Sequence, residues 1–226
     1  MLIGVRKRFI FVANTKAAST AIERALMPYA EIHRGGSPAQ KHIALHDVLA
    51  EYDFLFGQPG QAPERFFKFG VMREPIDWIG SWFRYRKGNE VESPLPAEMS
   101  LAEFWARGDW NIIRRDGRRH LQRDRFTAPD GTMLADMIIP YHELDAYLPA
   151  ITAHLGVPGR LDRLNVSRIT PDDAPIPDTL RAEMRDFYAA DYALWEQLEA
   201  INAQGMETLK ATRPLKAHGA DRKPQP

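Results

Sequence analysis

The stretch from Phe9 to Thr20 constrains the fold of this chain more than any other. Its first four residues, Phe-Ile-Phe-Val, are an uninterrupted β-prone run, as expected of a strand buried on both faces. Small polar residues and one lysine follow, and from Ala21 onwards apolar residues recur at helical spacing until Pro28 stops them. The sequence therefore predicts a strand, a tight turn and a helix.

The predicted turn suits an anion. The first turn of a helix leaves backbone N–H groups without intrahelical partners and carries the positive end of the helix dipole. Lys16 adds a mobile positive charge, and Ser19 and Thr20 add hydroxyl donors. These groups predict a phosphate or sulfate site, although the glycine pattern of a Walker A loop is absent. The alternative is that Ser or Thr merely caps the helix and that Lys16 is solvated.

A second strand-like run, from Phe66 to Met72, leads into Arg73-Glu-Pro, and Ser81 follows eight residues after the arginine. The two stretches together resemble the sulfotransferase superfamily that uses 3′-phosphoadenosine 5′-phosphosulfate (PAPS). In that family one strand ends in Pro-Lys-x-Gly-[Ser/Thr]-[Ser/Thr], which binds the 5′-phosphosulfate. A later strand ends in Arg-[Asp/Asn/Glu]-Pro, and this arginine and a serine eight residues later bind the 3′-phosphate.

The resemblance implies roles for both stretches. In the first loop Thr15 stands in place of the family's proline and Ala18 in place of its glycine. A glycine would adopt positive φ freely, whereas alanine does so at a steric cost. The resemblance implies that Arg73 and Ser81 bind the 3′-phosphate. It assigns the 5′-phosphosulfate to Thr15, Lys16, Ala17, Ala18, Ser19 and Thr20.

Other segments resemble the family more weakly, so that the likeness covers roughly residues 8 to 200. These segments are 138–144 with 155–158, Leu164-Asn-Val-Ser167 and Tyr188-Ala-Ala-Asp-Tyr192. The likeness implies a P-loop NTPase-like sulfotransferase fold. It also implies in-line transfer of a sulfuryl group from PAPS, without a metal ion, to a hydroxyl of an acceptor such as a carbohydrate. Lys16 would be the catalytic cation.

The glycan-modifying branch of the family has a Lys-His or similar element beside the acceptor. Lys41-His42 occupies the comparable stretch, which makes His42 the candidate general base; the alternative is a surface or capping histidine. His42 and His46 are spaced to share a helix face, a spacing that also suits a metal ion. Because two histidines at this spacing are by themselves weak evidence for a metal, we predict no metal site.

Two other functions stay open. A divergent P-loop kinase or nucleoside triphosphatase would need a magnesium ion, usually placed by an aspartate at the end of a second strand. Here Met72 is followed by Arg73, and Ile139 by Pro140, so neither strand end offers an aspartate. A protein that kept the fold as a nucleotide-binding module without turnover is the third possibility.

Two further groups of side chains have competing interpretations. The arginines between 107 and 125 fit either a solvated surface or a site for an anionic acceptor. Trp78, Trp82 and Tyr85 could stack on a ligand, but we interpret them as packing against the sheet.

Strands that alternate with helices predict an α/β protein, a three-layer α/β/α arrangement around a central parallel sheet, with 133–140 as a third strand. Both predicted anion loops follow strand ends, where such sheets bind ligands. We expect one domain over residues 1–205, with Gly205 ending the last helix, and a flexible tail over 206–226.

Composition restricts partners and location. A formal net charge of zero gives no general attraction to nucleic acid or to an anionic membrane, so any anion site must be local. The absence of cysteine excludes disulfides and fits a reducing compartment. The N-terminal residues become charged too early for a signal peptide, and no apolar run approaches a membrane span. We expect a cytoplasmic protein of undetermined oligomeric state.

Overall fold

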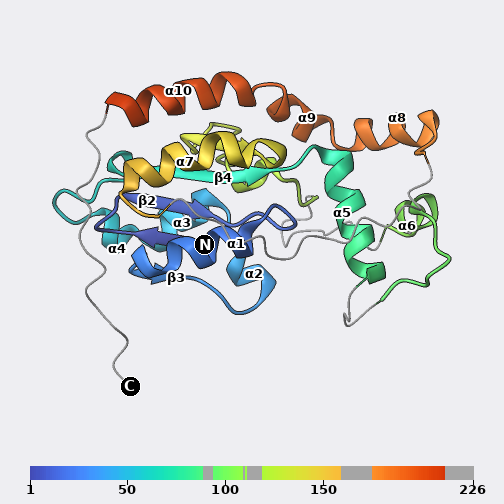
Figure 1. Ribbon diagram of the computed structural model, residues 1–226, viewed down its shortest axis with the longest axis horizontal. Coiled ribbons are helices and arrows are strands. Elements are labelled where there is room, and N and C mark those ends of the chain that lie inside the picture. Colours follow the sequence, from blue (N-terminus) through green and yellow to red (C-terminus); the bar gives the residue numbers. More distant parts are fainter. Residues whose placement is uncertain (89–93, 109, 111–118, 159–174, 212–226) are drawn as a thin grey trace.

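The computed structural model describes residues 1–88, 94–108, 110, 119–158 and 175–211. The chain forms a five-stranded sheet with strand order β3-β1-β2-β4-β5, and helices pack against it (Figure 1). Strands β2, β4 and β5 run parallel, whereas β1 is antiparallel to both β2 and β3. The strands are β1 (Leu2–Gly4), β2 (Phe9–Val12), β3 (Ile32–His33), β4 (Phe67–Met72) and β5 (Met137–Pro140).

The α/β class is confirmed and the centre of the sheet is parallel as predicted, but the sheet as a whole is mixed, because the antiparallel strands β1 and β3 were not predicted. The antiparallel strands β1 and β3 have only three and two residues, too few to leave a period in the sequence. A tight hairpin with Arg8 at φ 54° joins β1 to β2. The third predicted strand is also shorter than expected, because it begins at Met137 and not at Met133.

Ten α-helices and four short 3₁₀ helices occupy the described residues. The 3₁₀ helices are η1 (Met27–Tyr29), η2 (Pro63–Arg65), η3 (Arg123–Arg125) and η4 (Tyr141–Glu143). The α-helices are α1 (Ser19–Leu26), α2 (Pro38–Lys41), α3 (Leu45–Glu51), α4 (Asp53–Phe56), α5 (Pro75–Gly88), α6 (Leu101–Arg107), α7 (Leu144–Leu155), α8 (Asp178–Phe187), α9 (Ala189–Trp195) and α10 (Leu198–Ala211).

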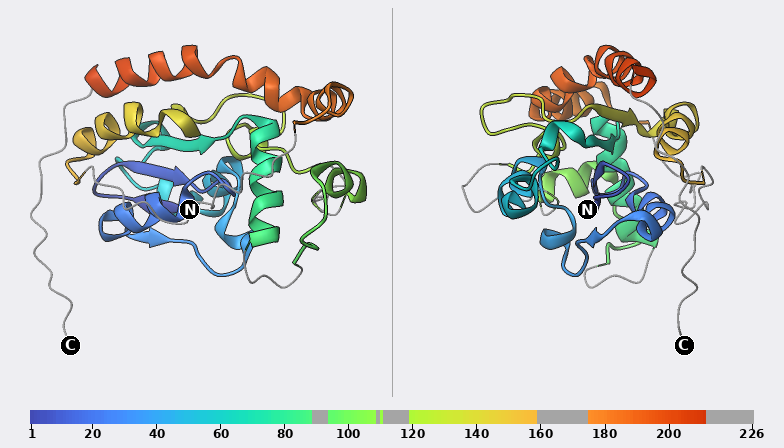
Figure 2. Two further views of the ribbon diagram at one scale, coloured as in Figure 1. Left: turned by 45° about the vertical axis from the view of Figure 1, so that its right-hand side comes forward. Right: turned by 90° about the vertical axis from the view of Figure 1, so that its left-hand side faces the viewer.

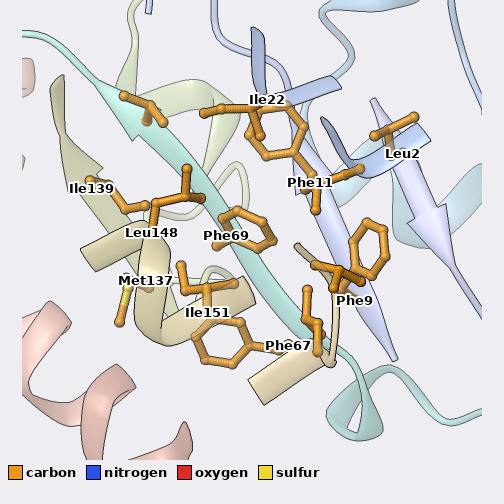
Figure 3. Packing of buried hydrophobic residues seen from close by; sticks show 14 of the residues in the cluster. Leu2, Phe9, Phe11, Ile22, Phe67, Phe69, Met137, Ile139, Leu148 and Ile151 are labelled. Atoms are coloured by element: carbon orange, nitrogen blue, oxygen red, sulfur yellow. The ribbon is translucent and has the colours of Figure 1, made fainter. Parts of the chain in front are cut away.

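Alternate residues of β2 enter two different cores, as the period of a strand requires. Phe9 and Phe11 pack with residues of α1 and α7 on one face of the sheet (Figure 3). Ile10 and Val12 pack with residues of α3, α4 and α9 on the other. Helices therefore cover both faces, which gives the expected three layers (Figure 2). The continuous apolar run of β2 reflects this burial on both sides.

A third apolar cluster lies beyond the sheet, at the end of the molecule where α5, α6 and α8 gather (Figure 1). It is rich in aromatic side chains, and Phe104 and Tyr188 are its most buried rings, at 0% and 1% exposure. Helix α5 starts beside the sheet and continues into this cluster, so it links the strand ends to the aromatic region.

The last helix passes the predicted boundary at residue 205 and continues to Ala211. Gly205 is therefore not a helix stop. A Cβ at this position would lie 2.5 Å from the carbonyl oxygen of Asp136, so glycine allows α10 to approach the chain just before β5. Residues 212–226 of the predicted tail, and the Leu164–Ser167 segment, lie outside the described residues.

No helix within the described ranges is both long enough and apolar enough to cross a membrane.

Candidate functional site

The loop between β2 and α1 has the backbone that its sequence pattern predicts. Lys16 and Ala18 both have φ of 57°, in the left-handed region. This conformation costs a residue with a Cβ about 1 kcal/mol, so position 18 has the geometry that favours glycine. Ala17, between them, is fully buried and anchors the loop in the core that also contains Phe9 and Phe11.

The N-terminus of α1 is not capped by a side chain. Its N-cap residue is Ala18, which has no side-chain oxygen, and no capping hydrogen bond forms from the described part of the chain. Ser19 is buried and its hydroxyl donates to the carbonyl of Asn14, while Thr20 is exposed. The interpretation of Ser or Thr as a cap is therefore wrong. The N-terminus of α1 therefore combines a first turn without a side-chain cap and the positive end of the helix dipole, which are features that an anion site uses.

Lys16 lies over α5 and is not fully solvated. Its Nζ is 3.6 Å from the ring centroid of Tyr85 and 5.9 Å from that of Trp82. Partial burial, together with the positive charges of Arg73 and Arg84, lowers the pKa of Lys16 to about 8. No carboxylate among the described residues forms an ion pair with it. An anion at this place would therefore relieve repulsion between like charges.

Arg73 follows β4 and connects three strand ends. Its Nε donates to the carbonyl oxygen of Lys16, and its Nη1 forms an ion pair of 2.7 Å with Asp77. Its guanidinium carbon lies 3.4 Å from the ring centroid of Tyr141, the residue directly after β5. The ends of β2, β4 and β5 are neighbours in the sheet. The two predicted loops therefore meet in direct contact.

The N-terminus of α5 differs from that of α1 because a carboxylate occupies it. The side chain of Glu74 accepts a 2.7 Å hydrogen bond from the backbone N–H of Asp77 and also one from the hydroxyl of Tyr192. Ser81 lies further along α5 with only 2% exposure. The structure thus brings Arg73 to the first loop but leaves Ser81 buried within its helix.

His42 forms a hydrogen bond with the backbone at the start of the first loop, directly after β2. Its Nδ1 lies 2.7 Å from the carbonyl oxygen of Ala13, so the ring donates from Nδ1 and its Nε2 carries the lone pair. Burial is the main cause that lowers the pKa of His42 to about 4, and the charges of Arg125 and Lys41 add to it against the hydrogen bond to Ala13. The imidazole is therefore neutral at pH 7.

The predicted common helix face of His42 and His46 is wrong. Helix α3 begins at Leu45, so His42 precedes it, whereas His46 lies within it and its Nδ1 is 3.3 Å from the carbonyl oxygen of Thr127. Among the described residues no group of three His, Asp or Glu side chains gathers as metal ligands would.

Aromatic side chains divide between packing and the site. Trp78 is 3% exposed and its Nε1 donates to the carbonyl of Thr15 at 2.9 Å, so it is a packing residue as predicted, but it packs in the aromatic cluster beyond the sheet and not against the sheet. Tyr85 is exposed and contacts Lys16, so the same interpretation is wrong for it. Tyr141 was not predicted, although its place directly after a buried parallel strand was a usable signal.

The arginine-rich segment is described only in part, because residues 111–118 lie outside the described ranges. Arg119 lies 3.9 Å from the ring centroid of Phe187, so this side chain packs on the aromatic cluster.

A cavity of about 530 Å³ lies elsewhere, between the start of α7 and the region of α9 and α10. None of the predicted site residues lines it. Its walls include Glu143, Glu196 and Glu199, whose negative charges would repel an anionic ligand. We therefore place the candidate anion site at the strand ends and not in this cavity.

Comparisons of the chain with models of protein families, with curated proteins and with solved structures found no match.

Proposed function

We propose that this protein is a PAPS-dependent sulfotransferase that acts on a hydroxyl of an acceptor, with a carbohydrate or glycan-like molecule as the acceptor class. One observation carries the proposal. Lys16 and Arg73 each follow a parallel strand, and the side chain of Arg73 donates a hydrogen bond to the backbone of Lys16. The two stretches that resemble the family's donor-binding loops are thus joined, at the edge of the sheet where α/β proteins bind ligands.

The charges and backbone of this edge fit a sulfated and phosphorylated donor. Lys16, Arg73 and Arg84 lie together, and Asp77 is the carboxylate that pairs with both arginines. The uncapped first turn of α1 adds N–H groups and a positive dipole end. Such a place favours a dianion held by backbone and side chains together. When bound, PAPS would supply the sulfuryl group.

Two side chains have properties that suit the transfer. The transfer would form a bond between acceptor oxygen and sulfur, break the bond between sulfur and the phosphate oxygen, and release the hydroxyl proton. Lys16 would stabilise the charge that develops on that phosphate oxygen, an interaction stronger in the transition state than in the ground state. His42, neutral and oriented by its bond to Ala13, would accept the proton at Nε2.

The P-loop kinase alternative receives less support from the strand ends. Its magnesium ion would call for a carboxylate directly after β4 or β5, and those positions hold Arg73 and Tyr141. Asp77 lies in the first turn of α5, where it is already paired with two arginines. The third possibility, a nucleotide-binding protein without turnover, is favoured by one observation, the strained backbone of Ala18 in the first loop.

Transfer of label from ³⁵S-PAPS to a panel of carbohydrate and alcohol acceptors, with ATP labelled at its γ-phosphate in parallel, tests the proposal. We expect label from PAPS in at least one product and no change of rate when a chelator of divalent cations is added. Transfer from ATP alone, abolished by the chelator, would establish the kinase. Binding of PAPS without transfer to any acceptor or to water would favour the module without turnover.

A further inference from the structure

Gln122 is a buried residue that contacts the start of both loops, where each loop leaves its strand. Its side-chain Oε1 accepts hydrogen bonds from Asn14 Nδ2 at 2.9 Å and from the backbone N–H of Arg73 at 3.1 Å. Its Nε2 donates to the carbonyl oxygen of the same Arg73 at 2.9 Å. Asn14 closes the arrangement by donating to the carbonyl oxygen of Val71 in β4, at 3.1 Å. The amide of Gln122 therefore acts on the protein and not on a ligand.

Gln122 is itself held from the opposite side. The carboxylate of Asp191, on α9, accepts the backbone N–H of Gln122 at 3.1 Å and that of Arg123 at 2.8 Å. Asn14, Gln122 and Asp191 all have 0% exposure. Four residues further along, Phe126 is also fully buried in the core that β2 and β5 share. The segment from Gln122 to Phe126 is therefore held at its start by Asp191 and at its end by the burial of Phe126, while the side chain of Gln122 contacts both loops.

We propose that Gln122 is a positioning residue that sets the separation of the two donor-binding loops, and that Asp191 holds Gln122 in place. This inference rests on the proposed function, because it gives the separation a purpose. A nucleotide with phosphates at both its 5′ and 3′ positions engages one loop with each. Its second contact is then intramolecular, and the strength of that advantage depends on how well the two loops are spaced.

This role predicts a pattern that simple loss of stability does not. A ligand that uses both loops loses its two-point advantage when the spacing relaxes. A ligand that uses one loop keeps its affinity, because each loop retains its own groups. Substitution of a residue needed only for stability would weaken the binding of all ligands alike, because a smaller fraction of the protein would be folded.

The test compares Gln122→Ala with wild type and with Gln197→Ala, a matched control in the turn between α9 and α10, whose exposed side chain donates to the carbonyl oxygen of Ala193. The probes are adenosine 3′,5′-bisphosphate, adenosine 5′-monophosphate and adenosine 3′-monophosphate. We expect the bisphosphate affinity of Gln122→Ala to fall by about tenfold or more and each monophosphate affinity to change by less than about twofold. Equal losses for all three, or an unchanged bisphosphate affinity, would overturn the proposal.

Hydrogen–deuterium exchange without ligand separates this proposal from the proposed function. We expect faster exchange in both loops, at residues 14–18 and 71–74, for Gln122→Ala but not for the control. Exchange unchanged in either loop contradicts the positioning role even if nucleotide binds. If wild type binds none of the nucleotides, the sulfotransferase proposal fails, and the exchange result alone then decides whether Gln122 sets the loop spacing. Should Gln122→Ala fail to fold, Gln122→Asn, one methylene shorter with the same amide, takes its place with the same expectations.

Discussion

The two loops at the edge of the sheet follow neighbouring parallel strands, yet they differ in how much of their bonding capacity the protein already uses. The loop after β2 leads into a helix without a side-chain cap, and its lysine has no carboxylate partner among the described residues. The loop after β4 leads into a helix whose first turn is occupied by Glu74, and its arginine is already bonded to Lys16 and Asp77.

This difference indicates that the two loops have unequal tasks. Within the described ranges, the first loop offers a helix N-terminus without a side-chain cap and a lysine without a carboxylate partner, so an anion there would not have to displace a carboxylate. The second loop holds the first in place, and a phosphate at Arg73 would have to compete with Asp77. Changes in the first loop should therefore affect chemistry, and changes in the second should affect binding and geometry.

The largest effect is expected for Lys16→Ala. If Lys16 stabilises charge that develops on the leaving phosphate, turnover should fall by about a hundredfold or more while nucleotide affinity falls much less. Steady-state kinetics with PAPS, together with nucleotide binding, measure the two quantities. Exposed Lys210, which pairs with Glu207 on α10, supplies the control variant Lys210→Ala. Turnover of Lys16→Ala near the wild-type value would refute the catalytic role.

Arg73→Ala should weaken the binding of adenosine 3′,5′-bisphosphate by about 2 kcal/mol or more, as the loss of a charge-assisted contact does. Adenosine 5′-phosphosulfate, which lacks the 3′-phosphate, should be affected far less. Asp77→Asn should have the opposite effect and strengthen bisphosphate binding, because it removes the competing carboxylate from Arg73 and Arg84. Titration calorimetry distinguishes these outcomes. Equal losses for both nucleotides in Arg73→Ala would assign Arg73 a structural role only.

The pH profile of kcat/KM, which reports the ionisations of the free enzyme, should be bell-shaped. His42 accepts a proton only above its pKa of about 4, and Lys16 loses its charge above its pKa of about 8. Activity should therefore fall about tenfold per pH unit below the first value and above the second. His42→Ala should lower turnover and remove the acid limb. An acid limb near 6.5, the ordinary range of histidine, would show that His42 is not the buried base described here.

The smallest effect is expected for Ala18→Gly. Because Ala18 has φ of 57°, glycine relieves steric strain, and part of this gain is offset by the greater freedom of glycine in the unfolded chain. We expect a stabilisation of up to about 1 kcal/mol, measured by denaturant unfolding. The same change at exposed Ala193, within α9, should destabilise by a similar amount. A loss of stability in Ala18→Gly would contradict the strained backbone.

Local sequence patterns were sufficient to predict the first loop and the strands that carry the site. The apolar run of β2, the small residues after it and the helical spacing beyond are all local, so they could be read from the chain. The positive φ at Ala18 agrees with the glycine that the resembled family has there. The ends of β2 and β4 were placed correctly for the same reason.

The parts that the sequence did not reveal depend on contacts between distant segments. Asn14 and Gln122 bond to each other across 108 residues, and no pattern in the chain connects them. Strands β1 and β3 are too short to show a period. Gly205 has two possible meanings in a sequence, a helix stop or a place of close approach, and only the neighbouring Asp136 carbonyl decides between them.

Isothermal titration of the wild-type protein with adenosine 3′,5′-bisphosphate, and separately with ATP and magnesium, tests the central claim most directly. The claim is that the ends of β2 and β4 form one site for a nucleotide with phosphates at both ends. We expect one bisphosphate per chain, bound more tightly than ATP, with the affinity unchanged by a chelator and reduced in Arg73→Ala. Tight binding of ATP with none of the bisphosphate would contradict the claim.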